Sequence, residues 1–247
     1  MLLDNRIFTC FQQEAKESTI DEIYLGLGYS AVTLTDGRCG LCYTLLDENT
    51  SCTVNKNPQD FEKQSALPLL EKIFSTASLD RTMAIALANA LNATFATSLS
   101  DAPLDLKQAL HLAQGSKVAM VGYFEPIARN LANEGIEVIA YDINKEIGKE
   151  KEFYDWARTN AEALILTATS VITGSTEQVF ESLGKKNIPM MLMGPSTIMR
   201  PMLYKDLGIT VCAGTVPTDI PNTLKAIRNG RGTPVLHRYA KKIHAFV

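Results

Sequence analysis

The chain has 247 residues, of which 46% are hydrophobic and 21% are charged, and its formal net charge is −3. This composition indicates a folded protein with enough apolar material for one or two cores. Its scattered Lys and Arg residues argue against nucleic acid or a membrane as a partner, and no run approaches the ~20 apolar residues that span a bilayer. The first residues reach Asp4 and Arg6 before any apolar run develops, so we expect no signal peptide and a cytoplasmic protein.

The first hundred residues predict a small α+β unit. Apolar residues recur at helical spacing over 5–15, and three short strands follow within 22–46. The pair Asp36-Gly37 between the last two strands is typical of a hairpin. Helices are expected over 67–77 and 80–93. This order predicts a small sheet with helices on one face.

The second half of the chain changes pattern after a predicted linker at about 93–116. Strands are predicted over 117–123, 136–142, 163–173, 188–194 and 209–216, and helices over 126–135, 150–161, 175–184 and 219–230. Continuous apolar strands that alternate with helices predict a parallel sheet covered on both faces. We therefore expect an α/β protein with two domains, residues 1–100 and 101–247. The remaining segment, 236–247, is a basic tail.

Five cysteines without a secretion signal argue against a disulfide framework. Cys39 and Cys42 have the spacing of a redox or metal-binding pair. They lie in a predicted strand, however, where residues three apart point to opposite faces. We expect two ordinary strand cysteines, unless a tight turn brings their thiols together. The three histidines, His111, His237 and His244, have no metal-ligand spacing.

The predicted sheet suggests where a ligand binds, because open parallel sheets bind ligands beyond the carboxyl ends of their strands. Small and hydroxylic residues crowd these ends, where they let a ligand approach the backbone and donate hydrogen bonds to it. The candidates are Gly122, Thr169, Gly174, Ser175, Thr176, Gly194, Pro195, Ser196 and Gly214. We expect an anion or an ordered water cluster between Ser196 and the 174–176 loop, facing Glu125 across the cleft. Ser175 has the alternative role of a helix cap, together with Gln178, and Ser196 that of a simple cap.

A dinucleotide is a poor ligand for this sheet. Asp142 lies 20 residues after Gly122, the distance expected of a ribose-binding acid. The glycines that would admit a pyrophosphate are missing, and Phe124 and Glu125 occupy their place. The sequence therefore argues against NAD or NADP as a cofactor.

Two further polar residues have two interpretations each. Glu125 begins a predicted helix, where it either interacts with the helix dipole or acts as a general acid or base in a cleft. Asn89 lies on an apolar helix, where it either bonds neighbouring backbone or faces the second domain and contacts the ligand.

Several runs occur in a specific order over nearly the whole chain: "GLGYSAVTL", "ALANALNA", "VGYFEPIARNLANEG", "TATSVITGSTEQVF", "LMGPSTIMRPMLYKDLGITVCAGTV" and "IRNG". In these runs the chain resembles the putative heavy-metal chelation family. The resemblance implies an N-terminal domain like that of enolase, a C-terminal Rossmann-like domain and an active site between them. The positions that match are Asn89, Gly122, Glu125, Pro126, Gly174, Thr176, Gly194, Pro195, Ser196 and Gly214. Relatives tend to have Asn-Gly-Thr where this chain has Thr173-Gly174-Ser175-Thr176, a difference that bears on ligand choice.

The leading hypothesis is a protein that binds a small anionic or metal-chelating molecule in a cleft between the domains. The ligand implied by the resemblance is a metal ion or a metal chelate. The alternatives are a metal-binding carrier without catalysis and a degenerate Rossmann oxidoreductase. The sequence does not decide whether the protein catalyses a reaction, and it leaves a homo-oligomer open.

Overall fold

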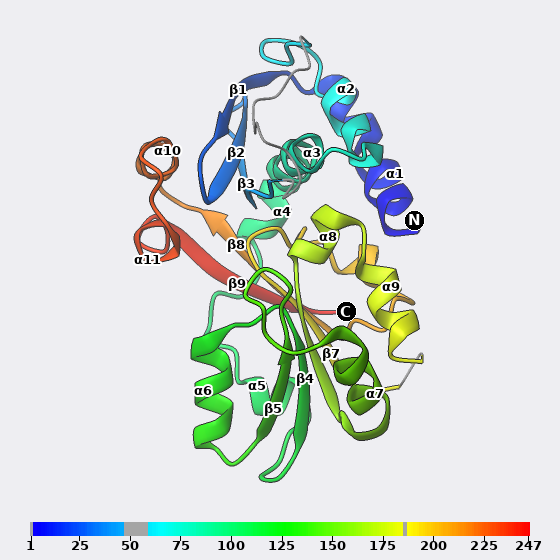
Figure 1. Ribbon diagram of the computed structural model, residues 1–247. Helices are drawn as coiled ribbons and strands as arrows, with labels where there is room; N and C mark the ends of the chain where they lie inside the picture. Colours follow the sequence, from blue (N-terminus) through cyan, green and yellow to red (C-terminus); the bar gives the residue numbers. More distant parts are fainter. Residues whose placement is uncertain (1, 47–58, 185–186) are drawn as a thin grey trace.

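The computed structural model describes residues 2–46, 59–184 and 187–247. It shows an α/β protein with a small N-terminal α+β part and a mostly parallel six-stranded sheet (Figure 1). The N-terminal part contains α1 (Leu2–Glu17), β1 (Ile20–Leu25), β2 (Tyr29–Leu34), β3 (Cys39–Tyr43), α2 (Leu67–Leu70), the 3₁₀ helix η1 (Glu71–Phe74), α3 (Ser78–Leu91) and α4 (Ala93–Thr97).

The elements of the second part follow the predicted alternation of strands and helices. They are α5 (Leu106–Ala109), β4 (Lys117–Val121), α6 (Glu125–Asn133), β5 (Glu137–Tyr141), α7 (Glu150–Asn160), β6 (Ala163–Thr167), α8 (Thr169–Thr173), α9 (Thr176–Ser182), β7 (Met190–Met193), the 3₁₀ helix η2 (Pro201–Tyr204), β8 (Val211–Pro217), α10 (Ile220–Arg228), α11 (Thr233–Leu236) and β9 (Ala240–Phe246). The strand order is β5-β4-β6-β7-β8-β9.

The three-stranded antiparallel sheet, β1-β2-β3, is covered on both faces and not on one as predicted. All six residues of β2 are buried, so this strand has no solvent face. Val32 and Leu34 belong to the main core with α3. Tyr29 and Ala31 instead pack with α10 and α11, helices from the far end of the chain (Figure 1). A strand that is apolar on both faces needs a cover on both.

Two other expectations were wrong. The segment 163–173 is not one strand, because β6 ends at Thr167 and the β-branched residues after it form α8. Tertiary contacts override strand propensity there, since Arg81 binds the carbonyl groups of α8. The basic tail contains β9, which pairs antiparallel with β8. Lys241 and Lys242 are both exposed on this edge strand, where charged side chains are tolerated.

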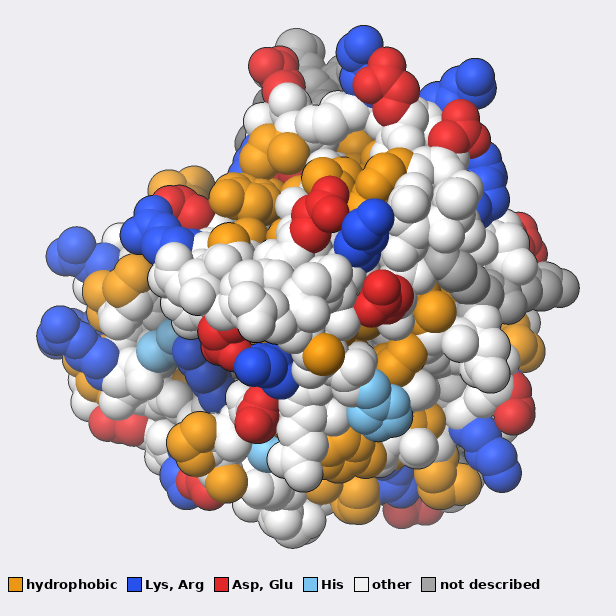
Figure 2. Space-filling model, turned by 90° about the horizontal axis from the view of Figure 1, so that it is seen from below, with side chains coloured by type: hydrophobic (Ala, Val, Ile, Leu, Met, Phe, Trp, Pro, Cys, Tyr) orange, Lys and Arg blue, Asp and Glu red, His pale blue; other side chains and the backbone are white. Residues whose placement is uncertain are grey.

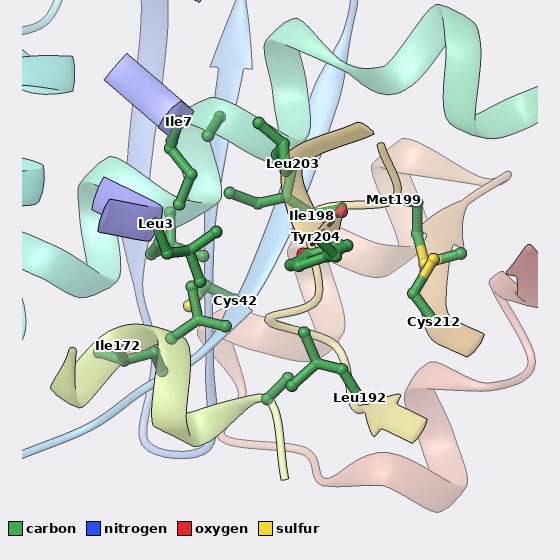
Figure 3. Packing of buried hydrophobic residues seen from close by; sticks show 14 of the residues in the cluster. Leu3, Ile7, Cys42, Ile172, Leu192, Ile198, Met199, Leu203, Tyr204 and Cys212 are labelled. Carbon is green, nitrogen blue, oxygen red and sulfur yellow. Dashed lines mark hydrogen bonds between the residues drawn. The ribbon is translucent and has the colours of Figure 1, made fainter. Parts of the chain in front are cut away.

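One hydrophobic core runs through both parts of the chain. Leu3 and Ile7 of α1 and Cys42 of β3 lie in the same cluster as Leu192 of β7 and Tyr204 of η2 (Figure 3). The apolar helix α3 belongs to this cluster too, and it packs against α8 of the second half of the chain. The division into residues 1–100 and 101–247 stays a prediction.

The surface of the molecule carries charges of both signs. Figure 2 shows acidic and basic side chains interspersed over one face, with small groups of hydrophobic side chains between them. Among the helices described, none is long and apolar enough to span a lipid bilayer.

Candidate functional site

The carboxyl ends of β4, β6 and β7 meet at one edge of the six-stranded sheet. Val121 pairs in register with Leu166, and Thr167 pairs with Met193, so these strands end side by side. The residues at these ends contact one another: Gly122 lies close against Thr167, Oγ1 of Thr167 lies 3.0 Å from Oγ1 of Thr169, and Gly194 lies close against Ala168. Asn89 of α3 joins this group through the carbonyl oxygen of Pro195, at 3.4 Å. We call the group the carboxyl ledge; it comprises Asn89, Gly122, Thr167, Thr169, Gly194 and Pro195.

The two glycines of the carboxyl ledge let its strand ends pack closely. Gly122 has a φ of +81°, and a Cβ atom there would lie 2.6 Å from Cβ of Thr167. Gly194 has a φ of +137°, and a Cβ atom there would lie 3.3 Å from Cβ of Ala168. Both backbone conformations favour glycine over other residues. Packing alone therefore accounts for both glycines, with or without a ligand.

Thr167 and Thr169 leave a hydroxyl proton free on the carboxyl ledge. Their Oγ1 atoms lie 3.0 Å apart, so one hydroxyl donates a hydrogen bond to the other. The amide of Thr169 also donates to Oγ1 of Thr167, at 3.3 Å. The second hydroxyl proton has no acceptor among the residues that the structure describes. Because both side chains are half-buried, that proton is available to a ligand.

Asn89 connects the carboxyl ledge to the N-terminal sheet. Its Nδ2 atom donates to the carbonyl oxygens of Leu41, at 2.8 Å, and Pro195, at 3.4 Å. Leu41 lies on β3, an edge strand whose outer carbonyl would otherwise lack a partner. The Oδ1 atom of Asn89 receives no hydrogen bond from any described residue. The side chain of Asn89 therefore bonds neighbouring backbone, and its Oδ1 atom is a free hydrogen-bond acceptor within the ledge.

Ser196 joins the same edge strand to the C-terminal part. It is only 1% exposed, and its Oγ atom accepts hydrogen bonds from the amide of Tyr43, at 3.1 Å, and the thiol of Cys42, at 3.4 Å. The structure thus places this hydroxyl against β3. Gly214 is also buried, and a Cβ atom there would lie 2.7 Å from Sδ of Met199. These two candidates lie in the packed junction between the parts.

The loop between α8 and α9 carries three more of the candidates. Gly174 ends α8 in the left-handed conformation, with a φ of +69°. Oγ1 of Thr176 is buried and lies 3.0 Å from Oγ of Ser170. Ser175 lies at the N-cap of α9, but its hydroxyl pairs with Thr173, at 2.7 Å, and caps no amide. The loop lies at the opposite end of α8 from Thr169.

The acidic candidates are engaged by groups outside the carboxyl ledge. Glu125 is exposed in the first turn of α6 and pairs with Arg129 one turn along the helix. Asp142 accepts hydrogen bonds from the amides of Tyr123, at 2.8 Å, Asn144, at 3.1 Å, and Lys145, at 3.2 Å. A ribose would have to displace these backbone donors to bind this carboxylate.

Arg81 and Asp4 form a buried ion pair that the sequence analysis missed. The two residues are 4% and 2% exposed, and the guanidinium binds both carboxylate oxygens, at 2.9 and 3.0 Å. The same guanidinium donates to the carbonyls of Ile73, Val171 and Ile172. It thereby ties α1, η1 and α3 to α8, the helix that begins at Thr169. The sequence feature that could have indicated this ion pair is a single arginine at the start of an apolar helix.

The two β3 cysteines diverge as predicted. Cys42 lies in the main core, whereas Cys39 packs in the separate cluster beneath α10 and α11. Burial raises the pKa of each thiol to about 12, although the hydroxyl of Ser196 partly offsets this for Cys42. Cys212 is also buried, and burial raises its pKa to about 12. Cys10 is exposed, and Cys52 lies outside the described residues.

We expect these differences to appear in thiol labelling. In a Cys52→Ser background, a thiol reagent should modify Cys10 quickly and Cys39, Cys42 and Cys212 only upon unfolding. Raising the pH through 9.0, the ordinary cysteine pKa, should not speed labelling of the buried three, because their raised pKa keeps them protonated. Counting labels by mass spectrometry checks this. The Cys10→Ser variant should lack the fast reaction, and a second fast thiol in the native protein would contradict the expectation.

Comparison with known protein families assigns the chain to one of them. Residues 105–246 and 8–92 match two family models, DUF364 and DUF4213, that share the description "putative heavy-metal chelation". The chain belongs to this family.

Two solved structures of unknown function from the DUF364 family share the fold over the whole chain. A protein from Pyrococcus horikoshii is 20% identical, with a TM-score of 0.83 and coverage of 100% of both chains. A protein from Desulfitobacterium hafniense DCB-2 is 14% identical, with a TM-score of 0.76 and coverage of 98% of this chain and 99% of that one. At these identities the likeness shows the fold alone. No curated protein matches the sequence.

The side chains that the structure describes do not fit a resident heavy-metal ion. Within residues 2–46, 59–184 and 187–247, no three His, Cys, Asp or Glu side chains are placed to hold a metal together. The carboxyl ledge itself offers only amide, hydroxyl and backbone groups. Such groups can bind a polar organic molecule, whereas soft metals prefer thiolate and imidazole.

Proposed function

We propose that this protein binds a small organic molecule of metal-chelating character on the carboxyl ledge. One observation carries the proposal: the ledge combines a free hydroxyl proton, from Thr167 and Thr169, with a free acceptor, Oδ1 of Asn89. The two groups come from different parts of the chain and lie where the ends of parallel strands meet. Ends of this kind are the usual ligand-binding edge of open α/β sheets.

A metal-chelating molecule suits these groups better than a simple anion does. Chelators carry oxygen and nitrogen atoms that both accept and donate hydrogen bonds, and the ledge offers one partner of each kind. It contains no Lys or Arg to neutralise an anion. Lys145 contacts the carbonyl of Tyr123, beside Gly122, and lies 3.6 Å from Asp142. The family description points to chelation as well.

The proposed function is the binding of a ligand, and Glu125 has no part in it. Glu125, the candidate general acid or base, pairs with Arg129 in solvent, and its side chain is 61% exposed. It has the environment of a surface residue at a helix N-terminus, where a carboxylate stabilises the helix.

The test is to measure the small molecule that co-purifies with the untagged protein. Thr169→Val removes one ledge hydroxyl while keeping the shape of the side chain. A lost hydrogen bond of roughly 0.5–1.5 kcal/mol should reduce the retained molecule about two- to tenfold. Thr159→Val is the control, because Thr159 is exposed on α7 and bonds only its own helix.

Mass spectrometry of the extracted molecule, normalised to protein, gives the result. Equal retention by both variants would contradict the proposal. So would a parent protein that retains no organic molecule.

A further inference from the structure

The family description suggests that the protein chelates a heavy metal, but the described side chains are not arranged to hold one. A chelating protein is expected to bring several thiols, imidazoles or carboxylates to one point. Here each class of ligand is scattered or already occupied within the part of the chain that the structure describes.

The thiols are separated by the fold. Cys39 and Cys42 lie on opposite faces of β3, in different hydrophobic clusters. A zinc site needs sulfur atoms at ~2.3 Å from one ion, which two faces of a sheet do not provide. Cys212 is buried and lies 3.5 Å from the carbonyl of Ala245. Cys10 is on the exposed side of α1, far in sequence from the others.

The imidazoles are isolated from one another. His111 lies in the turn after α5, with a φ of +53°. His237 follows α11, where burial and the nearby charge of Lys242 lower its pKa. His244 on β9 packs edge-on against Phe246, with ring centroids 6.2 Å apart. None belongs to a group of three metal-binding side chains among the described residues.

Three carboxylates already have partners. Asp4 is bound on both oxygens by Arg81, and Asp142 accepts three backbone amides. Glu125 is paired with Arg129. A cation would have to displace a guanidinium or a set of amides to reach these oxygens, at a cost in stability.

We infer that the residues described by the structure hold no heavy metal by their own side chains, and that any metal the protein handles is coordinated by the atoms of an organic ligand. The second half of this inference rests on the proposed function. The role of the polypeptide is then to recognise the organic part of a chelate, through the hydroxyl and amide groups of the carboxyl ledge. This assigns the ligand to the class of multidentate organic chelators, in place of free metal ions.

The experiment is equilibrium dialysis of the untagged full-length protein, first stripped of small molecules, against Zn²⁺ and against Cd²⁺. Citrate is present as a weak competitor, to remove loosely held surface ions. Metal content per chain is measured by atomic emission. We expect far less than one ion per chain for both metals, and no change in the Cys39→Ser,Cys42→Ser variant.

One ion per chain of either metal would overturn the inference, whichever residues hold it. The variant then locates the site: loss of metal with intact folding implicates β3, and retention implicates other residues. The Thr169→Val measurement uses no added metal. The proposed function can therefore fail while the dialysis result stands, and the reverse also holds.

Discussion

Replacing Arg81 with methionine is expected to lower the free energy of unfolding by about 3–5 kcal/mol, the usual cost of removing one partner from a buried ion pair. The substitution leaves the carboxylate of Asp4 buried without its counter-ion. It also removes the donors that satisfy carbonyl groups of η1 and α8. Urea unfolding followed by circular dichroism measures the loss.

Arg129→Met is the matched control, because it removes an arginine from an ion pair whose side chains are 70% and 61% exposed. It should change stability by less than about 1 kcal/mol, as exposed pairs do. Adding Asp4→Leu to Arg81→Met should recover part of the loss, since no unpaired charge then remains buried. Equal effects of the Arg81 and Arg129 substitutions would show that the buried pair does not stabilise the fold.

Gly40→Ala is expected to destabilise the protein by about 3 kcal/mol or more, at or above the upper end of the usual cost of overpacking. Gly40 lies on β3 where that strand crosses α3. A Cβ atom there would lie 2.1 Å from the amide nitrogen of Ala90 and 2.2 Å from the carbonyl oxygen of Ala86. Both contacts are with backbone, so no side chain can move aside. The helix itself would have to shift away from the sheet.

Gly28→Ala is the control for this change. Gly28 lies in the β1–β2 connection, and a Cβ atom there would meet nothing within 4 Å. A gain of about 0.4–1 kcal/mol is expected, because alanine restricts the unfolded chain more than glycine does. Thermal and urea unfolding of the two variants give the comparison. A Gly40→Ala protein as stable as its parent would mean that α3 and β3 are less tightly packed than the structure shows.

Much of the fold was accessible from the sequence, because periodicity reports local burial. Unbroken apolar runs such as 118–121 and 188–193 predict buried parallel strands, and both are present. The strand β9 was missed because Lys241 and Lys242 interrupt its apolar pattern. The covering of β2 by α10 and α11 was missed too, since sequence shows that a strand has two apolar faces but not what covers each.

The candidate site was predictable only in part. The rule for strand ends selected Gly122, Thr169 and Gly194, which lie together at one edge of the sheet. It also selected Ser196, whose bond to the amide of Tyr43 spans 153 positions of the chain. Nothing local in the sequence indicates such a partner. Arg81 was overlooked for the same reason, because a charge at the start of a helix is ordinarily solvated, and here its counter-ion lies 77 positions away.

The packing of α10 and α11 on the N-terminal sheet has a consequence for biosynthesis. Translation places about 190 residues between the end of β2 and the start of α10. At a synthesis rate of roughly 5–20 residues per second, α10 is therefore made about ten to forty seconds after β2. Until then the outer face of the N-terminal sheet lacks the helices that cover it in the folded protein. During that interval Tyr29, Ala31 and Leu41 present an apolar surface at the ribosome. Because α10 and α11 begin at Ile220 and Thr233 of the 247 residues, the second face of this sheet is covered only when synthesis of these residues is nearly finished.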